Sequence, residues 1–146
     1  MPYFFIIMSL VLIDQITKNL AETYLIPIAT YPIITNVFHL TYGSNTGAAF
    51  SILQGQQIFL IIVTSIITTA VIYYLFKNFK NNSMLINLSL SLIASGALGN
   101  LIDRIRLNYV RDFLDFMLIS FPLFNFADIF VTIGSVIVAY IFYIRS

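Results

Sequence analysis

The chain has 146 residues, of which 60% are hydrophobic and 9% are charged, and its formal net charge is +1. So little charge cannot solvate a globular surface, so we expect lipid to be the solvent and the chain to be an integral membrane protein. The near-neutral charge excludes a basic nucleic-acid surface, the absence of cysteine excludes disulfides and thiolate metal sites, and the single histidine, His39, excludes a multi-histidine metal centre.

Four apolar stretches approach the roughly 20 residues that a helix needs to cross a membrane. They cover residues 2–20, 58–76, 84–102 and 124–143. Residues 1–13, at the start of the first stretch, lack the basic residues of a signal peptide, and no small-x-small cleavage pattern follows them, so we expect this segment to stay attached as the first transmembrane helix. Because the first carries charged residues and the third carries several serines and asparagines, these two are expected to face protein rather than lipid.

The connections between these stretches differ in composition. Two prolines oppose a helix in the first connection, and residues 37–42 are rich in strand formers, which predicts a small β element outside the membrane core. Residues 77–83 form a short polar turn, whereas residues 106–122 mix charges with large apolar side chains, which favours a short interfacial helix or gate. The predicted fold is a single all-α membrane domain over residues 1–146, with four transmembrane helices and an extracytoplasmic β element.

An even number of spans puts both termini and the 77–83 turn on one side of the membrane. All six acidic residues then lie towards the opposite side: Asp14, Glu22, Asp103, Asp112, Asp115 and Asp128. The positive-inside rule does not orient the chain clearly, because three basic residues lie on the terminal side and four lie among the acids. The 77–83 turn has two lysines and no acid to balance them, so we expect the termini to be cytoplasmic.

Ionisable groups at membrane depth are expensive unless they are paired. Asp14 and Lys18 are spaced i, i+4, which predicts a structural ion pair on one helix face. Asp128 has no base close to it in sequence, so we expect it to meet a second carboxyl group. Two carboxyls at close range share a proton, and such a pair of one acid and one carboxylate is how aspartic proteases activate water against a peptide bond.

The acidic partner of Asp128 stays open at this point. Asp112 and Asp115 would share one face of a helix, and Asp103 is a further candidate. Other hydrolytic mechanisms fit less well, since the sequence contains neither His-Glu-x-x-His nor Gly-x-Ser-x-Gly. A small proton-coupled transporter is an alternative, because intramembrane acids also suit an ion relay.

Five blocks of the sequence resemble, in order, the signature blocks of lipoprotein signal peptidase (signal peptidase II), an aspartic membrane peptidase family. They are DQITK (14–18), NTGAAF (45–50), GALGNLIDR (96–104), VRDFLD (110–115) and FPLFNFAD (121–128). The chain departs from the family pattern at Ser95, where a second glycine is usual, but the residue stays small.

This resemblance implies an enzyme that removes the signal peptide from diacylglyceryl-modified bacterial prolipoproteins, cutting just before the lipidated cysteine, with no cofactor and no metal. We expect it to act as a monomer in the bacterial cytoplasmic membrane, in contact with membrane lipid, with its site towards the extracytoplasmic face. A lipoprotein-binding protein without activity is the other alternative.

By the same resemblance, Asp112 and Asp128 form the catalytic pair. The residues expected to bind substrate or to support the site are Asp14, Lys18, Asn45, Gly47, Asn100, Asp103, Arg104 and Asn125. Among them, Asn45 and Asn125 are expected to donate amide hydrogen bonds to the substrate backbone. Asp103 is expected to pair with the arginine that follows it or to position the substrate.

Overall fold

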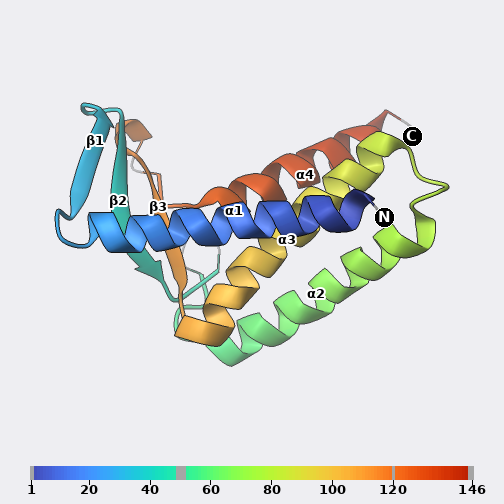
Figure 1. Ribbon diagram of the computed structural model, residues 1–146, viewed down its shortest axis with the longest axis horizontal. Helices are drawn as coiled ribbons and strands as arrows, with labels where there is room; N and C mark the ends of the chain where they lie inside the picture. Colours follow the sequence, from blue (N-terminus) through green and yellow to red (C-terminus); the bar gives the residue numbers. More distant parts are fainter. Residues whose placement is uncertain (1, 49–51, 120, 145–146) are drawn as a thin grey trace.

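Four long helices dominate the computed structural model, which describes residues 2–48, 52–119 and 121–144. They are α1 (Pro2–Leu25), α2 (Gln57–Asn78), α3 (Met84–Leu107) and α4 (Phe126–Tyr143) (Figure 1). Each is long and apolar enough to cross a membrane, and each overlaps one of the predicted stretches. The prediction of four transmembrane helices is therefore confirmed, and the chain is a multi-pass membrane protein.

Helices α1 and α3 run several residues further at their carboxyl ends than the apolar stretches that predicted them. The additional residues include charged side chains such as Glu22 and Arg106, so a hydropathy pattern ends before the helix does. Helix α3 ends at Leu107 and is capped by Asn108, which adopts the left-handed conformation (φ 63°) and donates its backbone N–H to the carbonyl of Arg104. These helical extensions bring polar side chains to one end of the bundle.

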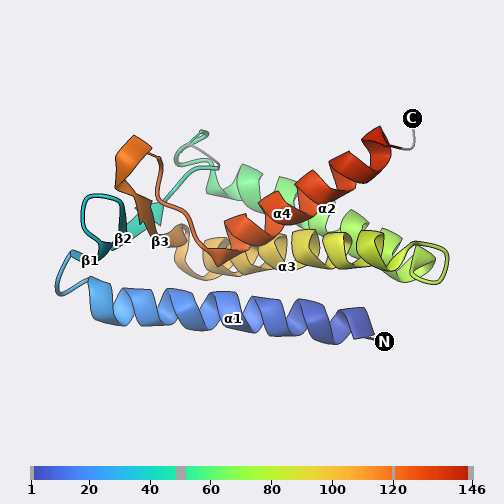
Figure 2. The same cartoon turned by 90° about the horizontal axis from the view of Figure 1, so that it is seen from above.

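Helix α3 lies at the centre of the bundle and packs against the other three helices (Figure 2). Within the apolar windows, 44% of α3 is buried, against 28% of α1 and 17% each of α2 and α4. The expectation that the first and third spans face protein therefore holds most clearly for α3. Its contact with α4 is close, because a Cβ at Gly134 would lie 2.6 Å from the carbonyl oxygen of Ser89.

Three antiparallel strands form a small sheet at one end of the bundle (Figure 1). They are β1 (Thr30–Ile34), β2 (Phe38–Asn45) and β3 (Val110–Phe116), in the order β1-β2-β3. The predicted β element is confirmed in β2, and Asn36 supplies a left-handed residue (φ 62°) to the turn before it. The sheet packs on the end of α1 through a buried cluster of Ala21, Leu25, Phe113 and Leu114.

The prediction of an interfacial helix within residues 106–122 is wrong for most of that segment. It forms β3 and then a single short 3-10 turn, η2 (Met117–Ile119). Valine and phenylalanine favour the strand, and the edge of β2 supplies backbone partners from a distant part of the chain. Because side chains alternate along a strand, Asp112 and Asp115 point to opposite faces and do not share a helical face.

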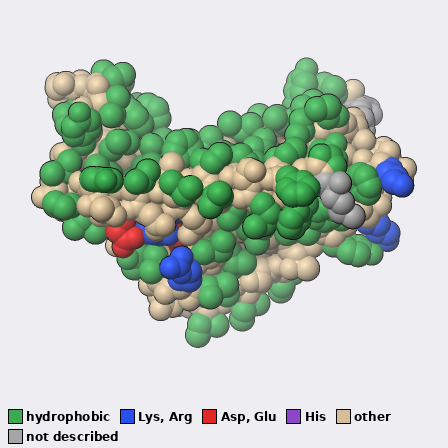
Figure 3. Space-filling view, viewed as in Figure 1, with side chains coloured by type: hydrophobic (Ala, Val, Ile, Leu, Met, Phe, Trp, Pro, Cys, Tyr) green, Lys and Arg blue, Asp and Glu red, His purple; other side chains and the backbone are tan. Residues whose placement is uncertain are grey.

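The surface reflects this arrangement of helices and sheet. The face drawn in Figure 3 is mostly hydrophobic along the helices, and the charged side chains visible on it gather towards the two ends of the molecule. Large apolar side chains are strongly exposed on the helices, for example Phe5 (68%) and Ile58 (77%). This distribution is typical of a protein whose flanks lie in lipid.

Candidate active site

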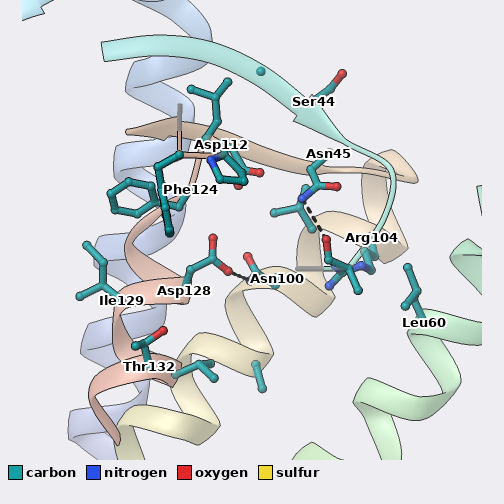
Figure 4. Close-up of a pocket in the computed structure, with 18 of the residues that line it drawn as sticks. Ser44, Asn45, Leu60, Asn100, Arg104, Asp112, Phe124, Asp128, Ile129 and Thr132 are labelled. Carbon is teal, nitrogen blue, oxygen red and sulfur yellow. Dashed lines mark hydrogen bonds between the residues drawn. The ribbon is translucent and has the colours of Figure 1, made fainter. Parts of the chain in front are cut away.

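The two aspartates predicted as the catalytic pair line one cavity of about 1070 Å³, where the sheet meets the helices (Figure 4). Asp112 comes from β3 and Asp128 from the first turn of α4. Three other predicted site residues, Asn45, Asn100 and Arg104, line the same cavity. Much of the remaining wall is apolar and includes Leu60, Phe116, Phe124, Ile129, Val131 and Ile133.

A capping box at the start of α4 positions Asp128. The side-chain oxygen of Asn125 accepts a hydrogen bond from the Asp128 backbone N–H at 3.0 Å. In return, Oδ2 of Asp128 accepts from the Asn125 backbone N–H at 3.1 Å. This reciprocal pair satisfies two backbone donors at the helix start and fixes the Asp128 side chain.

Backbone hydrogen bonds tie β3 to the residue that precedes this cap. The N–H groups of Phe113 and Leu114 donate to the carbonyl of Phe124 at 3.0 and 2.9 Å. The N–H of Phe124 donates back to the carbonyl of Leu114 at 3.1 Å. Asp112 directly precedes these hydrogen-bonded residues of β3, and the α4 cap directly follows Phe124. The backbone segments that carry the two carboxyls are therefore held together.

Two amide side chains bridge the carboxyls. Asn125 Nδ2 donates to Asp112 Oδ1 at 2.6 Å and to Asn100 Oδ1 at 3.2 Å. Asn100 Nδ2 donates to Asp128 Oδ1 at 2.8 Å. The amide of Asn125, which was predicted to bind the substrate backbone, is therefore occupied inside the protein, where it holds Asp112.

Asp112 is only 3% exposed, and its ionisation is perturbed accordingly. Burial and then the negative charge of Asp128 raise the pKa of Asp112 to about 7, although hydrogen bonds from Asn125 and Asn45 and the charge of Lys18 oppose the change. Below neutral pH, Asp112 therefore keeps its proton beside a second carboxyl group. That state supplies an acid and a potential base in one cavity.

A buried charge network lies beside the carboxyls. The predicted ion pair is present, with Lys18 Nζ 2.9 Å from Asp14 Oδ2, and Lys18 also lies 3.5 Å from Asp103 Oδ2. Asp14 Oδ1 accepts from the backbone N–H of Ala127 at 3.0 Å, which joins α1 to the start of α4. Lys18 Nζ donates to Asn100 Oδ1 at 2.9 Å, so the network reaches the bridging amides.

Asp103 does not pair with the arginine beside it. Its carboxylate instead binds Arg111, with Nη2 and Oδ1 only 2.7 Å apart, and Arg104 donates through Nη2 to the carbonyl of Gly47 at 2.9 Å. Neighbouring residues on a helix point in different directions, so Asp103 faces α1 and β3 while Arg104 faces the cavity. Arg111, which also pairs with Glu22 at 3.0 Å, was not predicted as a site residue. Had residues 110–115 been read as a strand, alternation would have placed it on the face opposite Asp112.

The loop after β2 forms another part of the cavity wall. Asn45 Oδ1 accepts from the backbone N–H of Gly47 at 2.8 Å, which makes a tight turn against Arg104. In this way Asn45 and Gly47 lie together with Arg104. Residues 49–50 of the same block lie outside the described residues.

Comparisons with known proteins agree with this geometry. A sequence model of the signal peptidase (SPase) II family matches residues 6–144. The chain is 47% identical over 137 residues to a lipoprotein signal peptidase of Caldanaerobacter subterraneus subsp. tengcongensis, covering 93% of this chain and 92% of that protein. It is 45% identical over 147 residues to a lipoprotein signal peptidase of Clostridioides difficile, covering 100% of this chain and 98% of that protein.

A solved structure of a bacterial membrane enzyme superposes with a TM-score of 0.83 at 32% sequence identity, covering 97% of this chain and 87% of that chain. The match extends over the helices and the sheet together, so the fold and the sequence blocks point to one family. The resemblance found in the sequence is confirmed, and the chain belongs to the signal peptidase II family of membrane peptidases.

Proposed function

We propose that Asp112 and Asp128 are the catalytic pair of this peptidase and that it removes the signal peptide from diacylglyceryl-modified prolipoproteins, cutting just before the lipidated cysteine. One observation carries the assignment of residues. The two carboxyls come from different elements, line the same cavity and are joined through the amides of Asn100 and Asn125.

The chemistry follows from one protonated and one ionised carboxyl group. The carboxylate takes a proton from a water molecule, whose oxygen attacks the scissile carbonyl, while the carboxylic acid donates its proton to the carbonyl oxygen as negative charge develops there. In the second step, the carboxyl that received the water proton passes it to the cysteine nitrogen, while the other carboxylate takes a proton back from a hydroxyl of the tetrahedral intermediate and so regains its starting form. The C–N bond then breaks, which releases the signal peptide with a new carboxyl terminus and leaves a free amine on the lipoprotein.

The apolar part of the cavity suits a lipid-modified substrate. Leu60 and Thr64 of α2 face the same space as Val131 and Ile133 of α4. Both carboxyls belong to one chain, so a monomer is sufficient for the reaction.

We propose the bacterial cytoplasmic membrane as the location, with cytoplasmic termini and the sheet on the extracytoplasmic side. The support is the turn between α2 and α3, which carries Lys80 close to Lys77 and has no acid to balance them. A site at the sheet end would then meet the lipid-modified cysteine at the outer surface of the membrane.

The test is cleavage of a purified diacylglyceryl-modified prolipoprotein by the protein in detergent, with a metal chelator present throughout. Asp112→Asn and Asp128→Asn are each expected to reduce kcat by roughly 10³-fold or more, since each removes one half of a unit that acts together. Asp115→Asn is the matched control, because Asp115 lies on the opposite face of β3 and binds Thr41 at 2.7 Å. Near-normal cleavage by either of the first two variants, in folded protein, would overturn the assignment.

A further inference from the structure

The proposed reaction needs one ionised and one protonated carboxyl, and the hydrogen bonds around the two aspartates differ. Both oxygens of Asp128 accept N–H donors: Oδ1 from Asn100 Nδ2 at 2.8 Å and Oδ2 from the Asn125 backbone at 3.1 Å. Asp112 accepts a hydrogen bond from the Asn125 amide at Oδ1, and Asn45 makes a smaller hydrogen-bonding contribution. An ionised carboxylate is an acceptor at both oxygens, so the surroundings of Asp128 match the ionised form.

The amide of Asn100 cannot turn around. Its oxygen accepts from Lys18 Nζ at 2.9 Å and from Asn125 Nδ2 at 3.2 Å, so both of its acceptor positions are filled. A reversed amide would place its NH₂ group against the Lys18 ammonium and its oxygen against the Asp128 carboxylate. The buried ammonium therefore keeps the Asn100 N–H directed at Asp128.

Several other charged groups lie near Lys18 and Asp128, but none of them fixes the orientation of the Asn100 amide. From α1, Asp14 partly balances Lys18 at 2.9 Å. From α3, Asp103 lies 3.5 Å from Lys18, but it is also bound by Arg111 of β3 at 2.7 Å. These groups neutralise much of the net charge of Lys18.

Two further charged groups lie on the cavity side. Arg104 of α3 interacts electrostatically with Asp128, and Asp112 of β3 is the second carboxyl itself. Arg104 hydrogen-bonds the carbonyl of Gly47, so it attracts both carboxyls without orienting an amide between them. Lys18 is therefore the charged group that acts in a defined direction, because it orients and polarises the Asn100 amide that donates to Asp128.

We infer, resting on the proposed function, that Lys18 is a positioning residue of the pair: through Asn100 it holds Asp128 as the ionised base and leaves the shared proton on Asp112. The raised pKa of Asp112, about 7, agrees with this assignment because the group is protonated below neutral pH. Asp128 on α4 then activates the water, and Asp112 on β3 acts as the acid.

The test measures kcat and KM as functions of pH for the wild type and for Lys18→Met. Loss of the ammonium is expected to move the acid limb of the kcat profile upwards by about one pH unit, which reduces the rate about tenfold at a fixed pH below the limb. KM is expected to stay within about twofold, since Lys18 is fully buried beside the carboxyls and does not line the cavity.

A second variant keeps the test valid if Lys18→Met leaves the buried carboxylate of Asp14 without its cation and the protein fails to fold. Asp14→Asn/Lys18→Met removes the ion pair as a unit and is expected to show an upward shift that is smaller, because the opposing charge of Asp14 is lost together with that of Lys18. If the role of Lys18 is purely structural, the variants should have a lower yield or melting temperature, but their normalised profiles of kcat against pH should superpose on that of the wild type. That superposition, in either folded variant, would overturn the inference, whereas absence of wild-type cleavage would instead count against the proposed function.

The location of the proton has its own measurement, which leaves Lys18 in place. With the proton on Asp112, the contribution of this group to the stability of the wild type is fully present below the ordinary carboxyl pKa of 3.8 and is lost as pH rises through about 7, because the unfolded chain gives up this proton more easily. Asp112→Asn should abolish that loss. Asp128→Asn should keep it, moved to lower pH because the repelling charge is gone. If Asp128→Asn gives the flat profile instead, the proton assignment is wrong.

Discussion

Asn125 combines a folding role with a role in the candidate site. Its side-chain oxygen caps α4, while its Nδ2 holds Asp112 at 2.6 Å. A serine at this position can still cap the helix but has no amide to reach the carboxyl. The two roles are therefore separable by substitution, although the wild-type residue performs them with one side chain.

We expect Asn125→Ser to lose most of the activity while it keeps most of the stability, and Asn125→Ala to lose both. The additional loss in the alanine variant should be about 1 kcal/mol in the free energy of unfolding, the usual value of a helix cap. Thermal denaturation in detergent and cleavage of the lipid-modified substrate measure the two effects. Equal stability of the two variants would show that the cap contributes little to this helix.

The ionisation of Asp112 predicts the alkaline side of the pH profile. If Asp112 must carry a proton to act as the acid, kcat is expected to fall above about pH 7, where the raised pKa of this group allows the proton to leave. The decline should approach tenfold for each pH unit. Asp115→Asn should show the same profile, and a rate that stayed constant to about pH 9 would contradict the role of Asp112.

At the scale of elements, the helices were predictable and β3 was not. Long apolar stretches identify α2 and α4 by composition alone. The strand character of β3 depends on pairing with β2, for example Ser44 with Arg111, and these residues are far apart in the sequence. Ion-pair partners were missed for the same reason: the bond between Asp103 and Arg111 follows from where β3 lies.

The contact between α3 and α4 also sets the position of the candidate site. A Cβ at Gly96 of α3 would clash with the carbonyl oxygen of Ala127, the residue before Asp128. A Cβ at Gly134, which lies further along α4, would meet the carbonyl oxygen of Ser89 on α3. We expect Gly96→Ala and Gly134→Ala each to reduce the free energy of unfolding by roughly 1–3 kcal/mol through overpacking.

Only the first of these variants should also reduce kcat, because, of these two glycines, Gly96 is the one that lies against the start of α4, where Asp128 is found. Melting temperature and cleavage rate, measured on the same preparations, separate the two effects. A normal kcat in folded Gly96→Ala would mean that the start of α4 tolerates displacement without disturbing the carboxyls.

For the whole molecule, the even number of transmembrane spans correctly predicted that the acidic residues gather at one end. Asp14, Asp103, Asp112 and Asp128 come from three helices and one strand, yet they belong to one connected set of hydrogen bonds and ion pairs. The sequence could place them at one end because an even number of spans fixes which ends meet. It could not assign their partners, since those depend on the directions of side chains after the sheet has formed.

The orientation in the membrane is testable because the chain contains no cysteine, so a single introduced thiol is labelled alone. Thr35→Cys lies in the exposed turn between β1 and β2, and Asn81→Cys lies in the exposed turn between α2 and α3. With cytoplasmic termini, a membrane-impermeant maleimide should label the first in intact spheroplasts and the second only after permeabilisation. Both should react in detergent and retain cleavage, which controls for folding. The reverse labelling pattern would place the sheet and both carboxyls on the cytoplasmic side, where a substrate whose modified cysteine lies at the outer surface could not reach them.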